Sequence, residues 1–169
     1  MGTGQTLLTI GAVMLLGTII LTTSRSLVDN NEVLLKNNLQ LEEVSLATSV
    51  IEEAQEKAFD ENTILQTDTS LSQLTPDSLL GQENNDPTDT NDFDDYNGLN
   101  GMGLVQADTM NTGLIYYDST RVFYVALGNL NGISSTATWN KRLDVWVWSK
   151  DDPGDTVKMS TIYSYWWFR

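Results

Sequence analysis

The side chains best suited to chemistry lie close together between Glu83 and Asp95, a stretch rich in carboxylates and asparagines. Calcium takes about six to eight oxygen ligands from flexible loops, so these are donors of the right type. The candidate ligands are Asp89, Asp92, Asp94 and Asp95. The EF-hand spacing, with its distal glutamate, cannot be aligned here. The pattern therefore favours a solvated acidic loop, with a weak calcium site as the alternative and no other cofactor expected.

Histidine and cysteine are both absent from the sequence. Their absence excludes Ser-His-Asp and Cys-His catalysis, the usual structural zinc sites, iron–sulfur clusters and disulfides. Two carboxylates about 5 to 10 Å apart could hydrolyse a glycosidic bond. Among 23 acidic residues, however, some pair meets that distance by chance. We therefore predict no catalytic residue and expect that the chain is not an enzyme.

The formal net charge of −14, from 23 acidic and 9 basic residues, opposes binding to the phosphate backbone of nucleic acid. Aromatic side chains gather near the C-terminus instead, at Trp146, Trp148, Trp166, Trp167 and Phe168. Core and cross-strand packing is the favoured interpretation of these aromatics. A sugar-binding or subunit-contact role is the alternative, and nucleic acid is not expected as a partner.

An uncharged apolar run occupies residues 5–23, which as a helix would measure about 28 Å, close to the thickness of a hydrocarbon core. No basic residue precedes the run and no Ala-x-Ala pattern follows it before Arg25, which favours an uncleaved membrane helix over a signal peptide. Only lipid or further copies of the same helix are long enough to bury it. The expected filament-core residues are Leu7, Leu8, Ile10, Val13, Leu15, Leu16, Ile19 and Ile20.

The helix is expected to continue through residues 24–61, which contain no proline or glycine. Its apolar stripe is Val44, Ala47, Ile51, Ala54 and Ala58, with Glu42, Glu43, Glu52, Glu53 and Glu56 on the flanks. Packing of this stripe against the protein's own head is favoured over packing on a neighbouring subunit.

Composition changes abruptly at residues 62–112, which are rich in Asp, Asn, Thr, Ser and Gln and read as an acidic variable loop region. From 113 to 169 the pattern moves toward period two. The runs are Ile115–Tyr117, Val122–Leu127, Leu143–Val147 and Val157–Tyr165. The turn at Pro153-Gly154 should join the last two strands as a hairpin. We predict an α+β fold, in which the long helix covers an antiparallel sheet of three or four strands.

This order of parts resembles a type IV pilin, and several short segments are similar to minor pilins of the mannose-sensitive haemagglutinin type. The segments are Ile51–Ala54, Ala58–Thr63, Phe93–Gly98, Lys141–Val147 and Asp155–Thr161. The resemblance implies a homopolymeric filament built on the N-terminal helices. It also implies membrane insertion before assembly, an assembly machinery and a prepilin peptidase. A leader of residues 1–4 would then be removed between Gly4 and Gln5.

The N-terminus departs from the pilin pattern, which has a basic leader and a glutamate at the fifth position after cleavage. Thr9 occupies that position here, and it offers only a hydroxyl oxygen to a neighbouring amine. Arg25 just after the apolar run also opposes export of the head, by the positive-inside tendency. The resemblance favours an exported head, and we keep that prediction.

The sequence therefore predicts a structural subunit of an extracellular, pilus-like filament that polymerises through its apolar helix. The alternative is a single-pass, membrane-anchored adhesin or receptor-like head that does not polymerise. Both interpretations share every anchoring feature, so extraction of the helix from lipid into a fibre distinguishes them.

Overall fold

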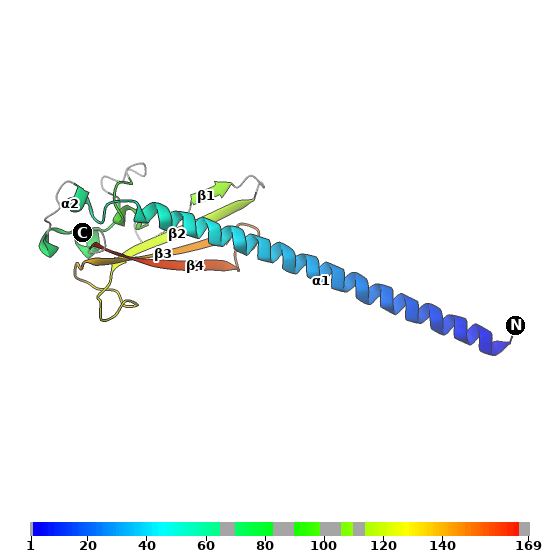
Figure 1. Cartoon of the computed structure of the whole chain (residues 1–169). Coiled ribbons are helices and arrows are strands. Elements are labelled where there is room, and N and C mark those ends of the chain that lie inside the picture. Colours follow the sequence, from blue (N-terminus) through cyan, green and yellow to red (C-terminus); the bar gives the residue numbers. More distant parts are fainter. Residues whose placement is uncertain (1, 65–69, 83–89, 99–105, 110–113, 166–169) are drawn as a thin grey trace. The chain divides into compact units, whose positions relative to one another are not determined.

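A computed structural model describes residues 2–64, 70–82, 90–98, 106–109 and 114–165 (Figure 1). The chain divides into two compact units, residues 1–39 and residues 40–169. The first unit is the N-terminal part of helix α1. The second contains the rest of that helix and an antiparallel sheet, and the predicted α+β class is confirmed.

Helix α1 runs without a break from Thr3 to Gln55. The sequence predicted a continuation to residue 61, and the structure ends the helix earlier because residues that follow it pair elsewhere. Ala58 forms a parallel bridge with Asp92, and its carbonyl accepts the N–H of Phe93 at 2.8 Å. A separate short helix, α2, spans Glu61–Ile64.

The buried face of α1 differs in part from the predicted stripe. Ala47 and Ala54 are fully buried as expected, but Val44 is 41% exposed. Glu43 was placed on a solvent flank, yet it is 1% exposed and its Oε1 accepts the N–H of Ser149 at 3.0 Å. The small side chains at 47 and 54 let the helix approach the sheet closely, and the ordered backbone donor makes burial of Glu43 tolerable.

Four strands form one sheet in the order β1-β2-β3-β4, and every neighbouring pair is antiparallel. Their bounds are Gln106–Thr109, Ile115–Tyr124, Asn140–Ser149 and Thr156–Ser164. The predicted hairpin across Pro153-Gly154 joins β3 to β4. Two predictions differ from the structure: the runs 115–117 and 122–127 belong largely to the single strand β2, and β1 lies inside the region predicted as loop.

The core of the second unit lies between the sheet and residues 40–55 of α1. Leu143, Val145 and Val147 of β3 are fully buried on the face that the helix covers. Polar contacts fasten the two layers together, since Gln55 Nε2 donates to Thr161 Oγ1 at 2.7 Å and the Tyr116 hydroxyl donates to Glu42. Three short 3-10 helices, η1 (Leu71–Gln73), η2 (Asp77–Leu79) and η4 (Asp94–Tyr96), complete the described chain.

Candidate functional site

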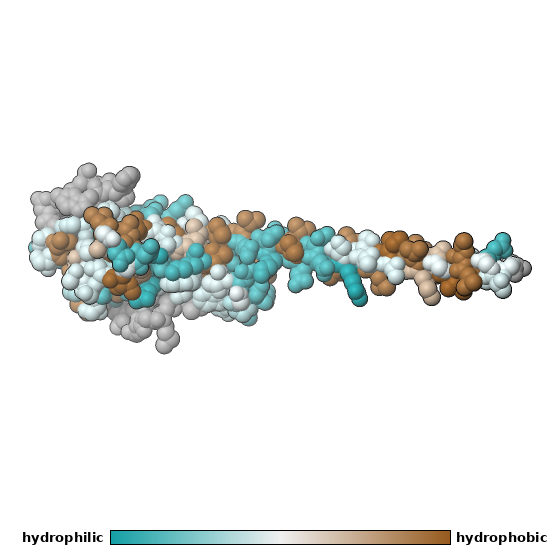
Figure 2. Space-filling view, turned by 90° about the horizontal axis from the view of Figure 1, so that it is seen from below, coloured by the Kyte–Doolittle hydropathy of each residue, from teal (hydrophilic) through white to brown (hydrophobic). Residues whose placement is uncertain are grey.

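The N-terminal part of α1 carries an apolar surface that nothing in its own unit covers. All eight predicted filament-core residues are exposed, from 53% at Ile10 to 75% at Leu8. Figure 2 shows the hydrophobic side chains along this part of the helix. By length and composition, α1 can cross a membrane.

Threonine hydroxyls in this apolar segment form hydrogen bonds with the backbone of the same helix. The hydroxyls of Thr6, Thr9, Thr18 and Thr22 each donate to a carbonyl three or four residues earlier. The Thr9 hydroxyl therefore donates its hydrogen bond to Thr6 O at 2.9 Å. Gly4 and Gln5, the predicted processing residues, lie in the first turn of the helix. The segment offers no charge and no free hydroxyl proton at these threonines.

The second unit contains a buried ionic cluster where the sequence predicted a solvated loop. Asp92, Asp94 and Asp95 are 0%, 0% and 1% exposed. Lys141 forms ion pairs with Asp94 and with Asp60, and Asp95 Oδ2 accepts the N–H groups of Asn91 and Asp92. The expectation of a solvated loop is therefore wrong for these three carboxylates. Short-range composition suggested solvent exposure, but the bridge between Ala58 and Asp92 draws the segment into the core.

Lys141 supplies the positive charge at the centre of the cluster. Its Nζ donates to Phe59 O at 2.8 Å, to Asp60 Oδ2 at 2.9 Å and to Asp94 Oδ1. These three acceptors use the three protons of the ammonium. The same nitrogen lies 4.7 Å from the centroid of the Phe59 ring. An ammonium satisfied in this way can remain charged although its side chain is 0% exposed.

The carboxylates of the cluster differ in their protonation. Burial alone would raise the pKa of Asp60, but the charge and hydrogen bond of Lys141 and the N–H groups of Thr75 and Asn62 hold it below its ordinary value. Burial and the charge of Asp94 raise the pKa of Asp92 to about 9. Burial also raises the pKa of Asp94, against the attraction of Lys141. Asp60 is thus an anion at neutral pH, and Asp92 holds a proton.

Two buried carboxylate oxygens of the cluster lack a hydrogen-bond donor among the described residues. Neither Asp92 Oδ2 nor Asp94 Oδ2 receives a hydrogen bond from an N–H or O–H group within the described part of the chain. The charge of Asp94 is one of the causes that raise the pKa of Asp92. Two ionised carboxylates would repel each other, and protonation of Asp92 removes this repulsion. The other oxygen, Asp92 Oδ1, accepts the N–H groups of Asp94 and Asp95 at 2.9 and 3.1 Å.

The cluster joins distant segments of the chain rather than presenting reactive groups to solvent. Asp60 also accepts the N–H of Thr75 at 3.0 Å, and the Tyr124 hydroxyl donates to Thr75 O at 2.8 Å. Burial raises the pKa of Tyr124, so the phenol stays protonated and remains a donor. The arrangement suits a structural crosslink, because no substrate can reach side chains with no exposed surface.

The predicted calcium ligands divide between this cluster and the undescribed part of the chain. Asp92, Asp94 and Asp95 come together, while Asp89 lies outside the described residues. Within the described ranges, no group of three or more acidic side chains is arranged to hold a metal ion. Lys141 occupies the centre of the cluster, where a bound cation would otherwise balance the carboxylates.

Sequence reasoning did not identify Asp60 and Lys141 as cluster residues, although one signal for Lys141 was present. Leu143, Val145 and Val147 were predicted to alternate, and Lys141 has the same parity, so it had to face the core with them. Nothing local marks Asp60, whose lysine partner lies 81 residues further along the chain.

The aromatic residues of β3 lie on the outer face of the sheet rather than in the core. Trp146 and Trp148 are half-buried there. Trp148 pairs with Tyr117, with ring centroids 6.0 Å apart, and Lys158 Nζ lies 4.7 Å from the centroid of the Trp146 ring. The predicted cross-strand packing is therefore found, but core packing is not. Trp166, Trp167 and Phe168 fall outside the described residues.

A pocket of about 630 Å³ lies at the edge of β2, beside this outer face. Its wall includes Asp77, Arg121 and Trp146. Because charges of both signs line it, the pocket does not select one class of ligand.

Comparison of the chain with protein-family models, with curated proteins and with solved structures gave no match. The resemblance to pilins therefore remains an expectation that rests on the residues themselves.

Proposed function

We propose that this chain is a structural subunit of an extracellular, pilus-like filament, which is inserted in the membrane before assembly and polymerises through its N-terminal helix. The observation that carries the proposal is the exposed apolar surface of α1 at residues 7–20. No role in catalysis is included, because the one dense cluster of titratable groups on the described residues is sealed around Lys141.

The energetic argument concerns where this apolar surface can be buried. Burial of a Leu, Ile or Val side chain contributes about 1.5 to 3 kcal/mol, so eight such side chains favour burial by on the order of 10 kcal/mol or more. Lipid and a bundle of identical helices satisfy this demand equally well. Since transfer from lipid to bundle exchanges one apolar environment for another, assembly needs no exposed intermediate in water.

Charge distribution supports a bundle of helices. Arg25 and Lys36 balance Asp29 and Glu32 in the first unit, which carries no other charged side chain. The formal charge of −14 therefore resides in residues 40–169. Helices without net charge can lie side by side without repulsion, while acidic heads keep the outside of the fibre hydrated.

The test compares filament and membrane fractions from the same cells. Surface material is sheared off, imaged by negative-stain electron microscopy and identified by mass spectrometry, and the membranes are extracted with detergent. The wild-type chain and Lys150→Ala, a change at an exposed residue of the head, should both appear in sheared fibres. Leu15→Asp should remove the chain from fibres, whereas Leu15→Ile should not.

One outcome decides against the filament. If cells that display other fibres yield the wild-type chain only in detergent-extracted membranes, the chain is a single-pass anchored head that does not polymerise. Fibres of Leu15→Asp at wild-type abundance would also contradict assembly through the apolar helix.

A further inference from the structure

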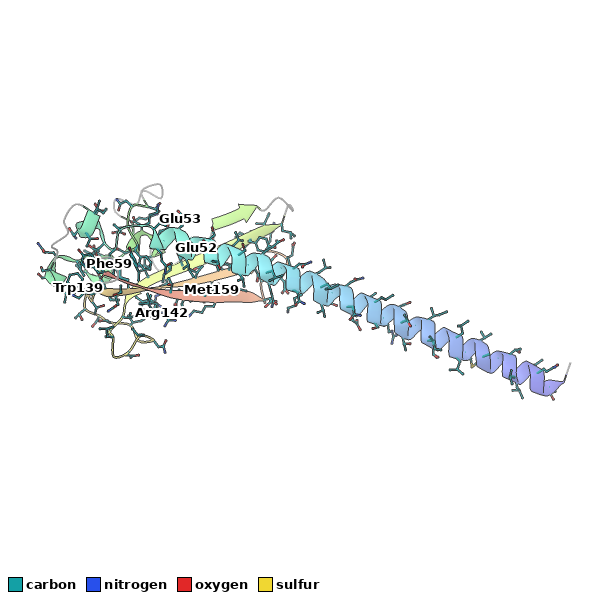
Figure 3. The ribbon with its side chains drawn as sticks, in the orientation of Figure 1. Glu52, Glu53, Phe59, Trp139, Arg142 and Met159 are labelled. Carbon is teal, nitrogen blue, oxygen red and sulfur yellow. The ribbon has the colours of Figure 1, made fainter. Side chains whose placement is uncertain are left out.

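We propose that the outer face of the sheet binds a second copy of this chain, through the exposed glutamates at the end of α1 in that copy. The inference rests on the proposed filament and deepens it, since it adds a contact between heads to the bundle of helices. Here the outer face means the four cross-strand rows of β2, β3 and β4 that point away from α1. The acidic face means Glu52, Glu53 and Glu56 (Figure 3 labels the first two).

Register places the outer-face residues in four rows across three strands. Residues directly opposite each other in a sheet share a face, and the partners of the buried Leu143, Val145 and Val147 define the inner one. The outer rows are Tyr117–Trp148–Thr156, Ser119–Trp146–Lys158, Arg121–Asp144–Ser160 and Phe123–Arg142–Ile162. Helix α1 contacts the inner side chains, such as Met159 and Thr161, so the helix does not cover the outer rows. The loop before β3 reaches one end of these rows, where Arg142 Nη1 donates to Leu130 O at 3.2 Å.

The outer face is basic although the chain is strongly acidic. Its rows contain three of the nine basic residues and a single carboxylate, Asp144. Asp144 is already paired, at 2.7 Å with Arg142 and at 2.8 Å with Lys158. Arg121 makes no ion pair within the described part of the chain and is exposed, with its guanidinium 5.6 Å from the Phe123 ring centroid. The rows thus keep an excess of positive charge, which Asp77, in the pocket wall with Arg121, offsets only in part.

The side-chain types on this face are those that make protein contacts. Arginine, tryptophan and tyrosine are enriched in interfaces and at their energetic centres. Here they occur together on neighbouring strands, with Trp146 and Trp148 only half-buried. Because these side chains keep part of their surface exposed, contact with a second protein can bury the rest.

The partner is a second copy because the same chain supplies the complementary surface. Glu52, Glu53 and Glu56 are all exposed; the first two lie in the last turn of α1, and Glu56 directly follows the helix. These glutamates lie in the helix layer, on the opposite side of the sheet from the outer face, because α1 covers the inner face. Two copies of a head with this charge repel each other unless unlike faces meet. A contact between two different faces is head-to-tail, and repetition of such a contact builds an open helical fibre.

Cysteine trapping tests the contact directly, because the native chain contains no cysteine. Two versions of the full-length chain, Ser160→Cys and Glu53→Cys, are co-expressed in one strain, and sheared fibres are oxidised mildly. We expect a disulfide-linked dimer that contains one chain of each kind, at least about tenfold more abundant than dimers from either version alone. Lys150→Cys, which lies in the turn beyond the outer face, should replace Ser160→Cys without giving the dimer.

Charge reversal gives an independent measurement on the full-length chain. Arg121→Glu should lower the yield of fibres at least about tenfold, because like charges across an interface are unfavourable. Adding Glu53→Arg to the same chain should restore fibres. Lys150→Glu makes the same change in net charge away from the face and should leave the yield unchanged. Tryptophan fluorescence of each variant confirms that the head is folded.

The outcomes separate this inference from the filament itself. If wild-type fibres form, no mixed dimer is trapped, and Arg121→Glu assembles as well as Lys150→Glu, the inference is overturned and the filament stands. If instead wild-type fibres bind heparin beads, and Arg121→Glu fibres form at the wild-type yield but do not bind the beads, the face serves an acidic polysaccharide and the second-copy assignment is wrong. If fibres never form but solubilised chains give the mixed dimer, the contact survives and the filament does not.

Discussion

Removal of the buried ammonium should be the most damaging single change in the head. Lys141→Met keeps much of the volume of the side chain but deletes three hydrogen bonds, to Phe59 O, Asp60 and Asp94. Both ion pairs are buried with 0% of either side chain exposed, so solvent cannot compensate for the loss. Breaking a buried ion pair by removing one partner costs about 3 to 5 kcal/mol. We therefore expect a loss of stability of this size, with a fall in Tm on the order of 10 °C or more.

Tryptophan fluorescence can follow this unfolding specifically, because all five tryptophans lie at residue 139 or beyond. The full-length chain is unfolded with urea in a mild detergent at pH 7, beside the exposed Lys150→Met as the matched control. The control should stay within about 0.5 kcal/mol of the wild type. A second substitution, Asp60→Asn, should recover part of the loss in Lys141→Met, because it removes the stranded charge.

The loss should also depend on pH. Without the ammonium, Asp60 and Asp94 can escape the burial penalty by taking up protons, so Lys141→Met should differ less from the wild type at pH 4 than at pH 7. A difference below about 1 kcal/mol between Lys141→Met and Lys150→Met at pH 7 would refute the claim that this ionic cluster holds the head together.

Three further predictions concern the proton, the helix surface and processing. Because the pKa of Asp92 is raised from 3.8 to about 9, the folded head binds a proton that the unfolded chain has lost over this pH range. The free energy of unfolding should therefore fall as pH rises from about 4 toward 9. Asp92→Asn imitates the protonated acid, so it should flatten this pH profile when stability is measured by urea unfolding. A Cβ at Gly17 would meet no atom within 4 Å, so Gly17→Ile should leave the membrane-inserted subunit intact. If helices pack closely at this residue, the same substitution should reduce the yield of fibres. An unchanged yield of fibres would exclude such packing. If a prepilin peptidase acts, the intact mass of the native chain should correspond to a start at Gln5, and a start at Met1 or Gly2 would refute this.

Local sequence patterns were sufficient to predict those elements in which the same pattern continues over several helical turns or strand positions. The helix α1 followed from the length of the apolar run and from the helix formers after it, which contain no proline or glycine. The β3–β4 hairpin followed from alternation on both sides of Pro153-Gly154. Strand β2 was harder, because Asp118 to Arg121 break the apolar pattern at its middle. Its continuity comes from unbroken pairing with β3, a non-local interaction that a single-strand pattern does not contain.

The buried ionic cluster was also not predictable from local sequence, because it depends on residues that are distant in the chain. An acidic stretch beside Pro87 has the composition of a solvated loop, and nothing within it distinguishes Asp92 from an exposed aspartate. The counter-charge, Lys141, is 47 residues from Asp94 in sequence, on the inner strand β3. Only the fold brings the two together, so the burial of these carboxylates could not have been read from their own neighbourhood.

The placement of charge links the buried cluster to the proposed assembly. The first unit has no net side-chain charge, so packing more helices into a bundle adds no electrostatic repulsion between them. The heads carry all of the excess, and a fibre brings many of them together. Protonation of Asp92 and the pairing of Asp60 and Asp94 with Lys141 reduce the charge of each head from inside. The remaining repulsion acts between surfaces, where salt screens it beyond about 10 Å. Contact at shorter range then requires unlike faces. Within the described residues of the head, the outer face of the sheet combines excess positive charge with half-buried tryptophan side chains.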